Sequence, residues 1–138
     1  MKTAIVIFCI SIALALASCT SNRYDSLTCD RLTEKIERRD SLSQKDYKLM
    51  IGQSCAILEY LVEKTESVDR IEDSDERHQA SKLLHADPEF MQRFGHLFTF
   101  SSILYQADLA GKLDEDNIQR YHDLEDWSDK FADMEENI

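Results

Sequence analysis

The stretch that decides the fold is residues 43–66, which read SQKDYKLMIGQSCAILEYLVEKTE. When successive residues are placed about 100° apart around a helix, the apolar side chains gather on one side and Lys48, Glu59 and Glu63 fall opposite. Ser43 precedes the pattern as a good N-cap residue. The segment is therefore predicted to be a long amphipathic helix packed against a core. Its predicted inward residues are Tyr47, Met50, Ile51, Ser54, Cys55, Ile57, Leu58, Leu61, Val62 and Thr65.

A thinner second stripe on this helix, formed by Leu49, Ala56 and Tyr60, lies away from the main apolar face. Two interpretations are open for it. The stripe packs against another helix, which we favour, or it forms an exposed contact patch.

Four further helices are predicted, and local signals mark where several of them start or stop. They cover residues 25–39, residues 73 to about 85, residues 88 to about 110, and a last stretch that begins at Asp114. Asp73 and Glu76 have the spacing of a capping box, and Asp87 followed by Pro88 is a strong helix start. Gly111 suits the C-terminal cap of the third of these helices. Because the chain has only three Gly and one Pro, we predict an all-α fold, a small helical bundle of four longer helices and one short one.

The predicted helix over 88–110 is apolar around most of its circumference, and no charged residue occurs between Leu97 and Ala107. Such a surface indicates burial on several sides, so we expect this helix to be the central one. Its apolar residues are Phe90, Met91, Phe94, Leu97, Phe98, Phe100, Ile103, Leu104, Tyr105 and Leu109. The inward residues of the last helix are predicted to be Ile118, Tyr121, Leu124, Trp127, Phe131 and Met134.

The chain begins with a different pattern. Lys2 precedes an apolar run over residues 4–17, and the segment ends in Leu16-Ala17-Ser18-Cys19. This pattern resembles the signal of bacterial lipoproteins, in which a lipobox ends at a cysteine that receives diacylglycerol. The resemblance implies that residues 1–18 are cleaved and that acyl chains on Cys19 anchor the protein to a membrane of the bacterial cell envelope. Residues 19–24 would then form a short tether to a single acidic helical domain over 25–138.

Cleavage by an ordinary signal peptidase after Ala17 is the alternative. It would leave Cys19, Cys29 and Cys55, an odd number in an oxidising compartment, whereas lipidation of Cys19 leaves an even pair. Cysteine counting therefore favours the lipoprotein interpretation. Cys19 is followed by Thr20 and not by Asp, which, by resemblance to the lipoproteins of enteric bacteria, favours the outer membrane over the inner one.

The remaining cysteines, Cys29 and Cys55, are predicted to form a disulfide. If the first two helices make an antiparallel hairpin that folds near Leu42, both cysteines lie 13 residues from the fold and on inward faces. A disulfide requires Cα atoms within about 4.4–6.8 Å, although packed helix axes are normally about 8–10 Å apart. The alternative is a pair of buried thiols that behave as small apolar side chains.

The charge of the chain is strongly acidic, with 27 Asp and Glu against 16 Lys and Arg. Cleavage of residues 1–18 removes only Lys2 from these groups, which leaves 15 basic and 27 acidic residues and a formal charge of −12. This charge disfavours binding to nucleic acid and can attract a basic protein, although it also describes an ordinary hydrated surface. Glu72, Asp73, Asp75 and Glu76 stand close together in a highly charged stretch and are the candidate contact for a protein partner.

Familiar catalytic and metal-binding patterns are missing from the sequence. His78 and His85 lie seven residues apart, about 10.5 Å along a helix, which is too far for one ion. The acids over 114–117 lack the Gly and Glu of a calcium loop, so a helix start explains them better. There is no G-x-S-x-G motif, and His96 beside a run of aromatics is interpreted as an ordinary helix residue. We therefore predict no catalytic residue, no metal site and no cofactor.

These observations favour a non-catalytic interaction or scaffold module that binds another envelope protein. A specific alternative is an immunity or inhibitor protein that uses acidic residues against a basic toxin or hydrolase. A second alternative is a carrier of small apolar ligands, with a pocket lined by Phe94, Phe98 and Tyr105, although these aromatics would otherwise simply be core. An enzyme is the least supported class.

Overall fold

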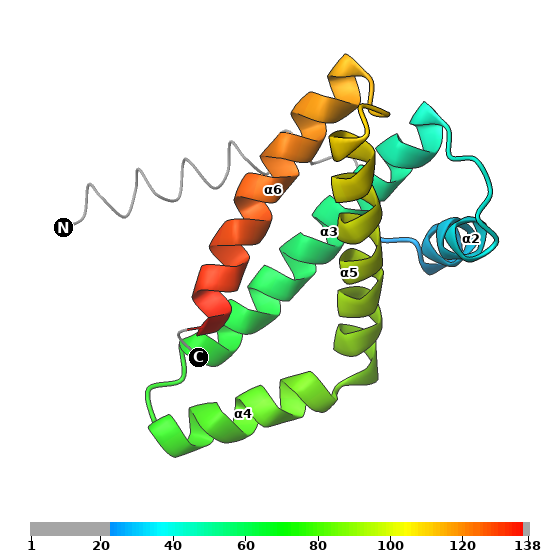
Figure 1. Ribbon diagram of the computed structural model, residues 1–138. Coiled ribbons are helices and arrows are strands. Elements are labelled where there is room, and N and C mark those ends of the chain that lie inside the picture. The colour runs from blue at the N-terminus through cyan, green and yellow to red at the C-terminus, as the bar shows by residue number, and fades with distance from the viewer. Residues whose placement is uncertain (1–22, 137–138) are drawn as a thin grey trace.

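The computed structural model describes residues 23–136, which fold into five helices without a strand in that range (Figure 1). The helices are α2 (Ser26–Glu37), α3 (Gln44–Asp69), α4 (Ser74–Ala86), α5 (Pro88–Leu109) and α6 (Glu115–Glu136). The predicted all-α bundle is confirmed, with two short helices, α2 and α4 of 12 and 13 residues, where one was expected. The predicted signal segment and Cys19 lie outside the described residues.

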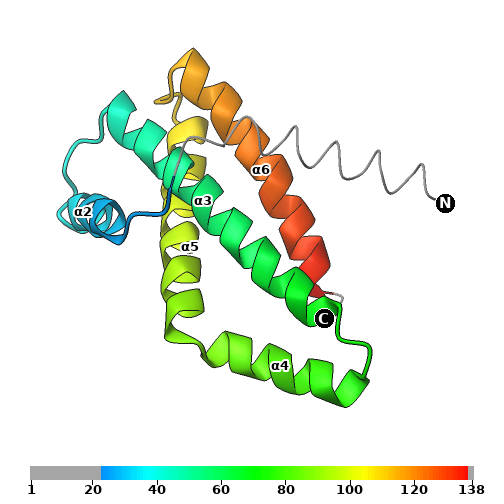
Figure 2. The same cartoon turned by 180° about the vertical axis from the view of Figure 1, so that it is seen from behind.

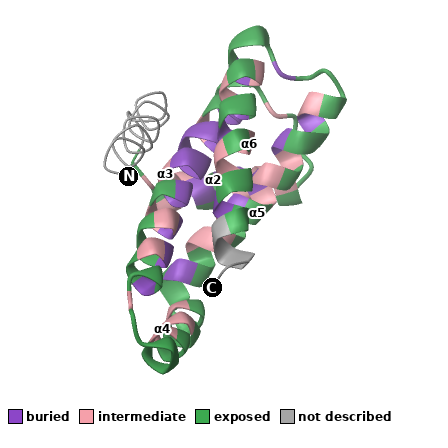
Figure 3. Cartoon of the chain, turned by 90° about the vertical axis from the view of Figure 1, so that its left-hand side faces the viewer, coloured by how far each residue is buried: buried purple, intermediate pink, exposed green. Residues whose placement is uncertain are grey.

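α3 is the central helix of the bundle. It contacts all four of the other described helices, and buried residues recur along its length (Figure 3). The prediction that the helix over 88–110 is central is wrong, because α5 leaves one of its sides open to solvent. Leu49 and Tyr60 are half-buried and pack against the core, which confirms the packing interpretation of the second α3 stripe. The buried apolar residues of α3 are Tyr47, Met50, Ile51, Cys55, Ile57, Leu58, Leu61 and Val68.

The other helices surround α3 in different directions. α4 runs from the end of α3 to the beginning of α5 and closes one end of the molecule (Figures 1 and 2). α2 and α6 lie at opposite sides of the α3–α5 pair in both views. The described residues that lead into α2 contact the α3–α5 pair, since Gln53 donates to Arg23 O at 2.9 Å and Tyr24 Oη lies 3.0 Å from His96 Nδ1.

Residues at the start of α3 hold its neighbours in place. Ser43 and Asp46 form a capping box, as each side chain accepts a hydrogen bond from the other residue's backbone N–H. Lys35 of α2 donates to both carboxylate oxygens of Asp46 at 3.1 Å. Burial opposes ionisation of Asp46, but the hydrogen bonds from Ser43 and Lys35 outweigh it and hold the pKa of this carboxyl below its usual value.

The α5–α6 turn is fixed by its own backbone and by α3. Gly111 has φ +67°, and the N–H of Lys112 donates to Ala107 O at 2.9 Å, as in a Schellman motif. The predicted cap at Gly111 is confirmed. Gln44 then accepts from the backbone N–H of Asp114 at 2.9 Å, so the start of α6 is held against the start of α3.

The predicted disulfide between Cys29 and Cys55 is wrong, because the structure does not join the two residues. Figure 1 shows α2 end-on while α3 runs across the view, so the helices cross and do not form the antiparallel hairpin that the prediction assumed. Cys29 instead faces Gln53, with its Sγ 3.5 Å from Gln53 Oε1. Gln53 also accepts from Asp25 N at 2.7 Å and donates to Arg23 O at 2.9 Å, which places an amide where a second sulfur was expected.

Candidate functional site

The most distinctive surface is an apolar stripe along α5, which we call the α5 stripe. It consists of Met91, Phe98, Tyr105 and Leu109, whose exposed fractions are 46%, 71%, 54% and 71%. The first three residues are spaced by seven, or about two helical turns, so they fall on one side of the helix. Other α5 residues of the same kinds, such as Phe90, Leu97 and Phe100, are buried. An aligned row of exposed aromatic and aliphatic side chains is typical of a binding surface, whereas single exposed apolar residues are ordinary.

A shallow apolar depression borders the stripe between α5 and α6. Its volume is about 220 Å³, and its lining residues are Phe94, Leu97, Phe98, Ser101, Ser128, Phe131 and Ala132. Of the three aromatics predicted to line a ligand pocket, Phe94 and Phe98 are brought together here. Tyr105 is not part of the lining and lies on the α5 stripe.

One side of the depression is formed by α6, which is strongly acidic. α6 contains nine Asp and Glu against one Arg and one Lys. Asp129 and Asp133, which follow the lining residues Ser128 and Ala132 in sequence, are both exposed. The α5 stripe is therefore an uncharged surface beside a negatively charged helix.

The acids predicted to contact a partner are Glu72, Asp73, Asp75 and Glu76. All four are exposed, with Glu72 and Asp73 in the turn between α3 and α4 and Asp75 and Glu76 in the first turn of α4. Asp73 has a structural task, because its carboxylate accepts from the backbone N–H groups of Asp75 and Glu76 at 3.0 and 2.9 Å. The turn lies at the same end of the molecule as the C-terminal part of α6 (Figures 1 and 2). It extends the acidic surface but is separate from the α5 stripe.

The opposite side of α5 is covered by the segment that leads into α2. Tyr24 Oη lies 3.0 Å from His96 Nδ1, and His96 Nε2 lies 3.4 Å from Asp30 Oδ1. Arg93 is sandwiched between two aromatic rings, with Cζ 4.3 Å from the centroid of Tyr24 and 3.9 Å from that of Tyr60. His96 is thus a satisfied helix residue, as predicted. The network fastens residues 23–30 to α5 on the side away from the stripe.

The Cys29 thiol sits within this covered side. Burial, followed by the nearby Asp30 and Asp25 carboxylates, raises the pKa of the thiol to about 12. A nucleophilic cysteine requires the opposite environment, one that stabilises the thiolate. The geometry therefore keeps Cys29 protonated near neutral pH.

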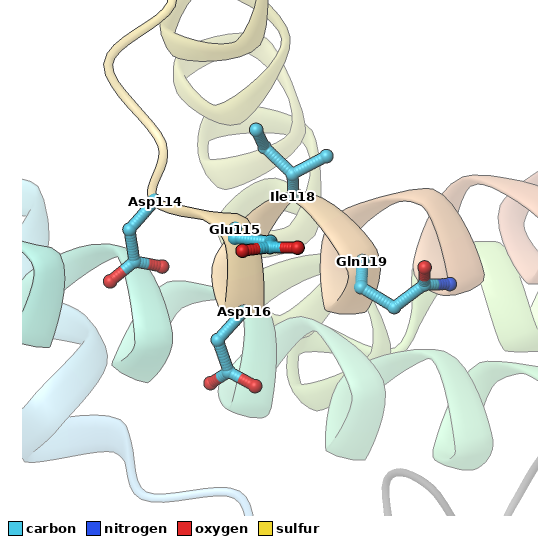
Figure 4. Close-up of a pocket in the computed structure, with 5 residues that line it drawn as sticks. All are labelled: Asp114, Glu115, Asp116, Ile118 and Gln119. Atoms are coloured by element: carbon cyan, nitrogen blue, oxygen red, sulfur yellow. The ribbon is translucent and has the colours of Figure 1, made fainter.

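The start of α6 carries the acids that were compared with a calcium loop (Figure 4). Asp114, Glu115 and Asp116 border an open depression there, but their carboxylates do not point toward a common centre. Asp114 accepts from the backbone N–H of Asn117 at 2.8 Å, and Asp116 pairs with Arg120 at 3.0 Å. The prediction that these acids mark a helix start is confirmed.

One cluster of potential metal ligands was missed by the sequence analysis. Asp108 of α5 and His122 and Glu125 of α6 place one ligand atom each within 4.8 Å of one another. Asp108 and His122 are 14 residues apart, so no short motif joins them. The only local signal was the His122-x-x-Glu125 spacing, which puts both side chains on one face of a helix.

Comparisons with protein families, with characterised proteins and with solved structures found no match for this chain. Among the described residues, no helix combines the length and apolar character needed to cross a membrane.

Proposed function

We propose that this chain is a lipid-anchored, non-catalytic binding module whose α5 stripe receives a basic amphipathic helix of another envelope protein. The observation that carries the proposal is the division of α5 into two apolar sides. Phe90, Leu97 and Phe100 are buried on one side, while Phe98 and Tyr105 are exposed on the other.

The shape of the surface favours a protein partner over a small ligand. The depression beside Phe94 and Phe98 holds about 220 Å³, whereas pockets for drug-sized ligands usually enclose about 300–1,000 Å³. The stripe continues well beyond it, from Met91 to Leu109. A row of anchors repeated every two helical turns matches the recognition of an amphipathic helix laid along it.

The charge of the surroundings specifies the kind of helix. With nine acids and two bases, α6 would repel an acidic partner and attract one whose apolar face is flanked by Lys and Arg. The same charge argues against anionic lipid headgroups as the occupant of the stripe. An inhibitor of a basic toxin or hydrolase would be a special case of this binding mode.

A lipid anchor on Cys19 would leave the α5 stripe accessible to a partner. From Cys19 to Arg23 the chain spans at most about 14 Å, so a lipid on Cys19 would hold the domain close to the bilayer. Tyr24 and Asp30 contact His96, which projects about 200° away from Phe98 around α5. The tether would therefore approach the domain from one side and leave the stripe free for a neighbouring protein.

Site-specific photocrosslinking in living bacteria tests the binding surface. A photoreactive amino acid is placed at Phe98 or Leu109, and the matched control is Leu27 of α2, which is 77% exposed. We expect one basic protein to be crosslinked from the two stripe positions and not from Leu27. The identified protein is then purified and titrated with the wild-type chain and its variants.

In that titration, Phe98→Ala and Tyr105→Ala should each weaken binding at least ~10-fold, as expected for aromatic anchors, while Leu27→Ala leaves it unchanged. Added salt should also weaken binding, because the charges around the stripe are exposed. The proposal is wrong if neither stripe substitution affects the complex. It is also wrong if the stripe mediates self-association or binds vesicles instead.

The anchor is tested separately with Cys19→Ser. We expect the wild-type chain to incorporate a labelled fatty acid and to sediment with membranes, and the variant to do neither. Labelling of the variant at wild-type level would refute lipidation at Cys19 without affecting the evidence for the stripe.

A further inference from the structure

A second feature of the surface involves Asp108, His122 and Glu125, at the place where the last turn of α5 meets α6. His122 Nε2 lies 3.4 Å from Asp108 Oδ2, and all three side chains offer a ligand atom within 4.8 Å of the others. The side chains of His122 and Asp108 are 52% and 28% exposed, so an ion can reach them from solvent. The three side chains are therefore accessible to solvent, and their ligand atoms are almost as close together as the ligands of a bound metal ion.

We propose that Asp108, His122 and Glu125 bind a divalent transition-metal ion of the zinc class, with water completing the coordination. An imidazole nitrogen and carboxylate oxygens are both ligands that zinc accepts, and three protein ligands leave the fourth position to water. The imidazole favours zinc and its neighbours over calcium, which prefers six to eight oxygen ligands.

The distances require only side-chain adjustment. Around a tetrahedral zinc ion with bonds of about 2.0–2.1 Å, neighbouring ligand atoms are roughly 3.3 Å apart. The His122–Asp108 pair already has nearly this separation at 3.4 Å. His122 and Glu125 lie one turn apart on one face of α6, so rotation of the Glu125 side chain can bring its carboxylate to the ion.

The electrostatic balance also favours a cation. Within the described range, no Lys or Arg pairs with Asp108 or Glu125, in contrast to Asp46 with Lys35 and Asp116 with Arg120. A bound dication would offset the two neighbouring carboxylates. It would also connect α5 to α6 beside Leu109, the last residue of the α5 stripe.

Isothermal titration of the full-length chain, purified without an affinity tag and stripped with EDTA, tests the site. We expect one Zn²⁺ per chain and no comparable binding of Ca²⁺. His122→Ala should weaken Zn²⁺ binding more than ~10-fold, because loss of a direct ligand should cost at least as much as loss of an outer-shell partner. The matched control is His78→Ala, an exposed histidine of α4, which should bind like the wild type.

Circular dichroism of each variant checks the fold, and His122 is exposed enough that its removal should leave the helices intact. Co²⁺ gives an independent readout, since its visible absorption should change on binding to the wild type and not to His122→Ala. The proposal is overturned if Zn²⁺ fails to bind the wild type, if His122→Ala binds it equally well, or if Ca²⁺ binds with similar affinity. The last two results would indicate general attraction to an acidic surface.

Discussion

The two sides of α5 have similar residues and opposite surroundings. Phe100 has no exposed surface and stacks against His96, with ring centroids 6.0 Å apart, whereas Phe98, two positions earlier, is 71% exposed. The covered side is closed by α3 and by residues 23–30, and the open side has no such cover among the described residues. The comparison teaches that apolar composition alone does not separate the residues that hold this fold together from those available to a partner.

Truncation of one phenylalanine on each side is the strongest test of this comparison. Phe100→Ala should reduce the free energy of unfolding by about 3–5 kcal/mol, because it removes a fully buried ring and leaves a cavity. Phe98→Ala should change it by less than about 0.5 kcal/mol. Urea unfolding followed by circular dichroism measures both values. Similar losses for the two variants would mean that Phe98 is not on an open surface.

The sequence predicts the parts of this fold that depend on local chemistry. The caps at Ser43 and Gly111 and the start at Pro88 were all found from neighbouring residues, because each involves groups only a few positions apart. The periodicity of α3 likewise identified most of its buried face. The open side of α5 was missed, since a helix that is apolar all round looks the same in sequence whether its last face meets core or solvent.

Features that depend on how helices cross could not be obtained in this way. The place of Cys29 opposite Gln53, and not opposite Cys55, follows from the crossing of α2 over α3. The meeting of Asp108 with His122 follows from the α5–α6 turn. In both cases the sequence spacing was compatible with several arrangements, and only the packing of whole helices selected one.

The same comparison of a covered and an open position can be made with two carboxylates, Asp46 and Glu72. Asp46→Asn removes the charge of a buried carboxylate that completes the capping box of α3 and pairs with Lys35, whereas Glu72→Gln changes an exposed acid at the α3–α4 turn. We expect Asp46→Asn to destabilise the fold at pH 7 by about 1 kcal/mol and Glu72→Gln to have little effect. Unfolding in urea at a series of pH values measures the difference.

The sign of the pH dependence follows from the lowered pKa of Asp46. Because its native pKa is below the ordinary value of 3.8, the ionised group stabilises the fold above that value, and the contribution is lost as the pH falls through the native pKa. The stability gap between the wild type and Asp46→Asn should therefore narrow below about pH 4. A gap that stays constant to lower pH would show that the charge of Asp46 is not the stabilising feature.

The smallest expected effect concerns Arg39, an exposed residue whose substitution should still change the free energy of unfolding. Arg39 follows α2 with φ 57°, the same left-handed conformation that Gly111 adopts after α5. The side chain makes this conformation costly by about 1 kcal/mol, a cost that Gly avoids. Because Gly also increases the freedom of the unfolded chain, the net gain from Arg39→Gly should be only about 0.5 kcal/mol. Arg39→Ala is the matched control, since it removes the same charge but keeps the Cβ atom, and it should unfold before Arg39→Gly in urea. If the two variants are equally stable, the turn after α2 relaxes without the left-handed residue, and exposure alone would then be enough to predict which substitutions this fold tolerates.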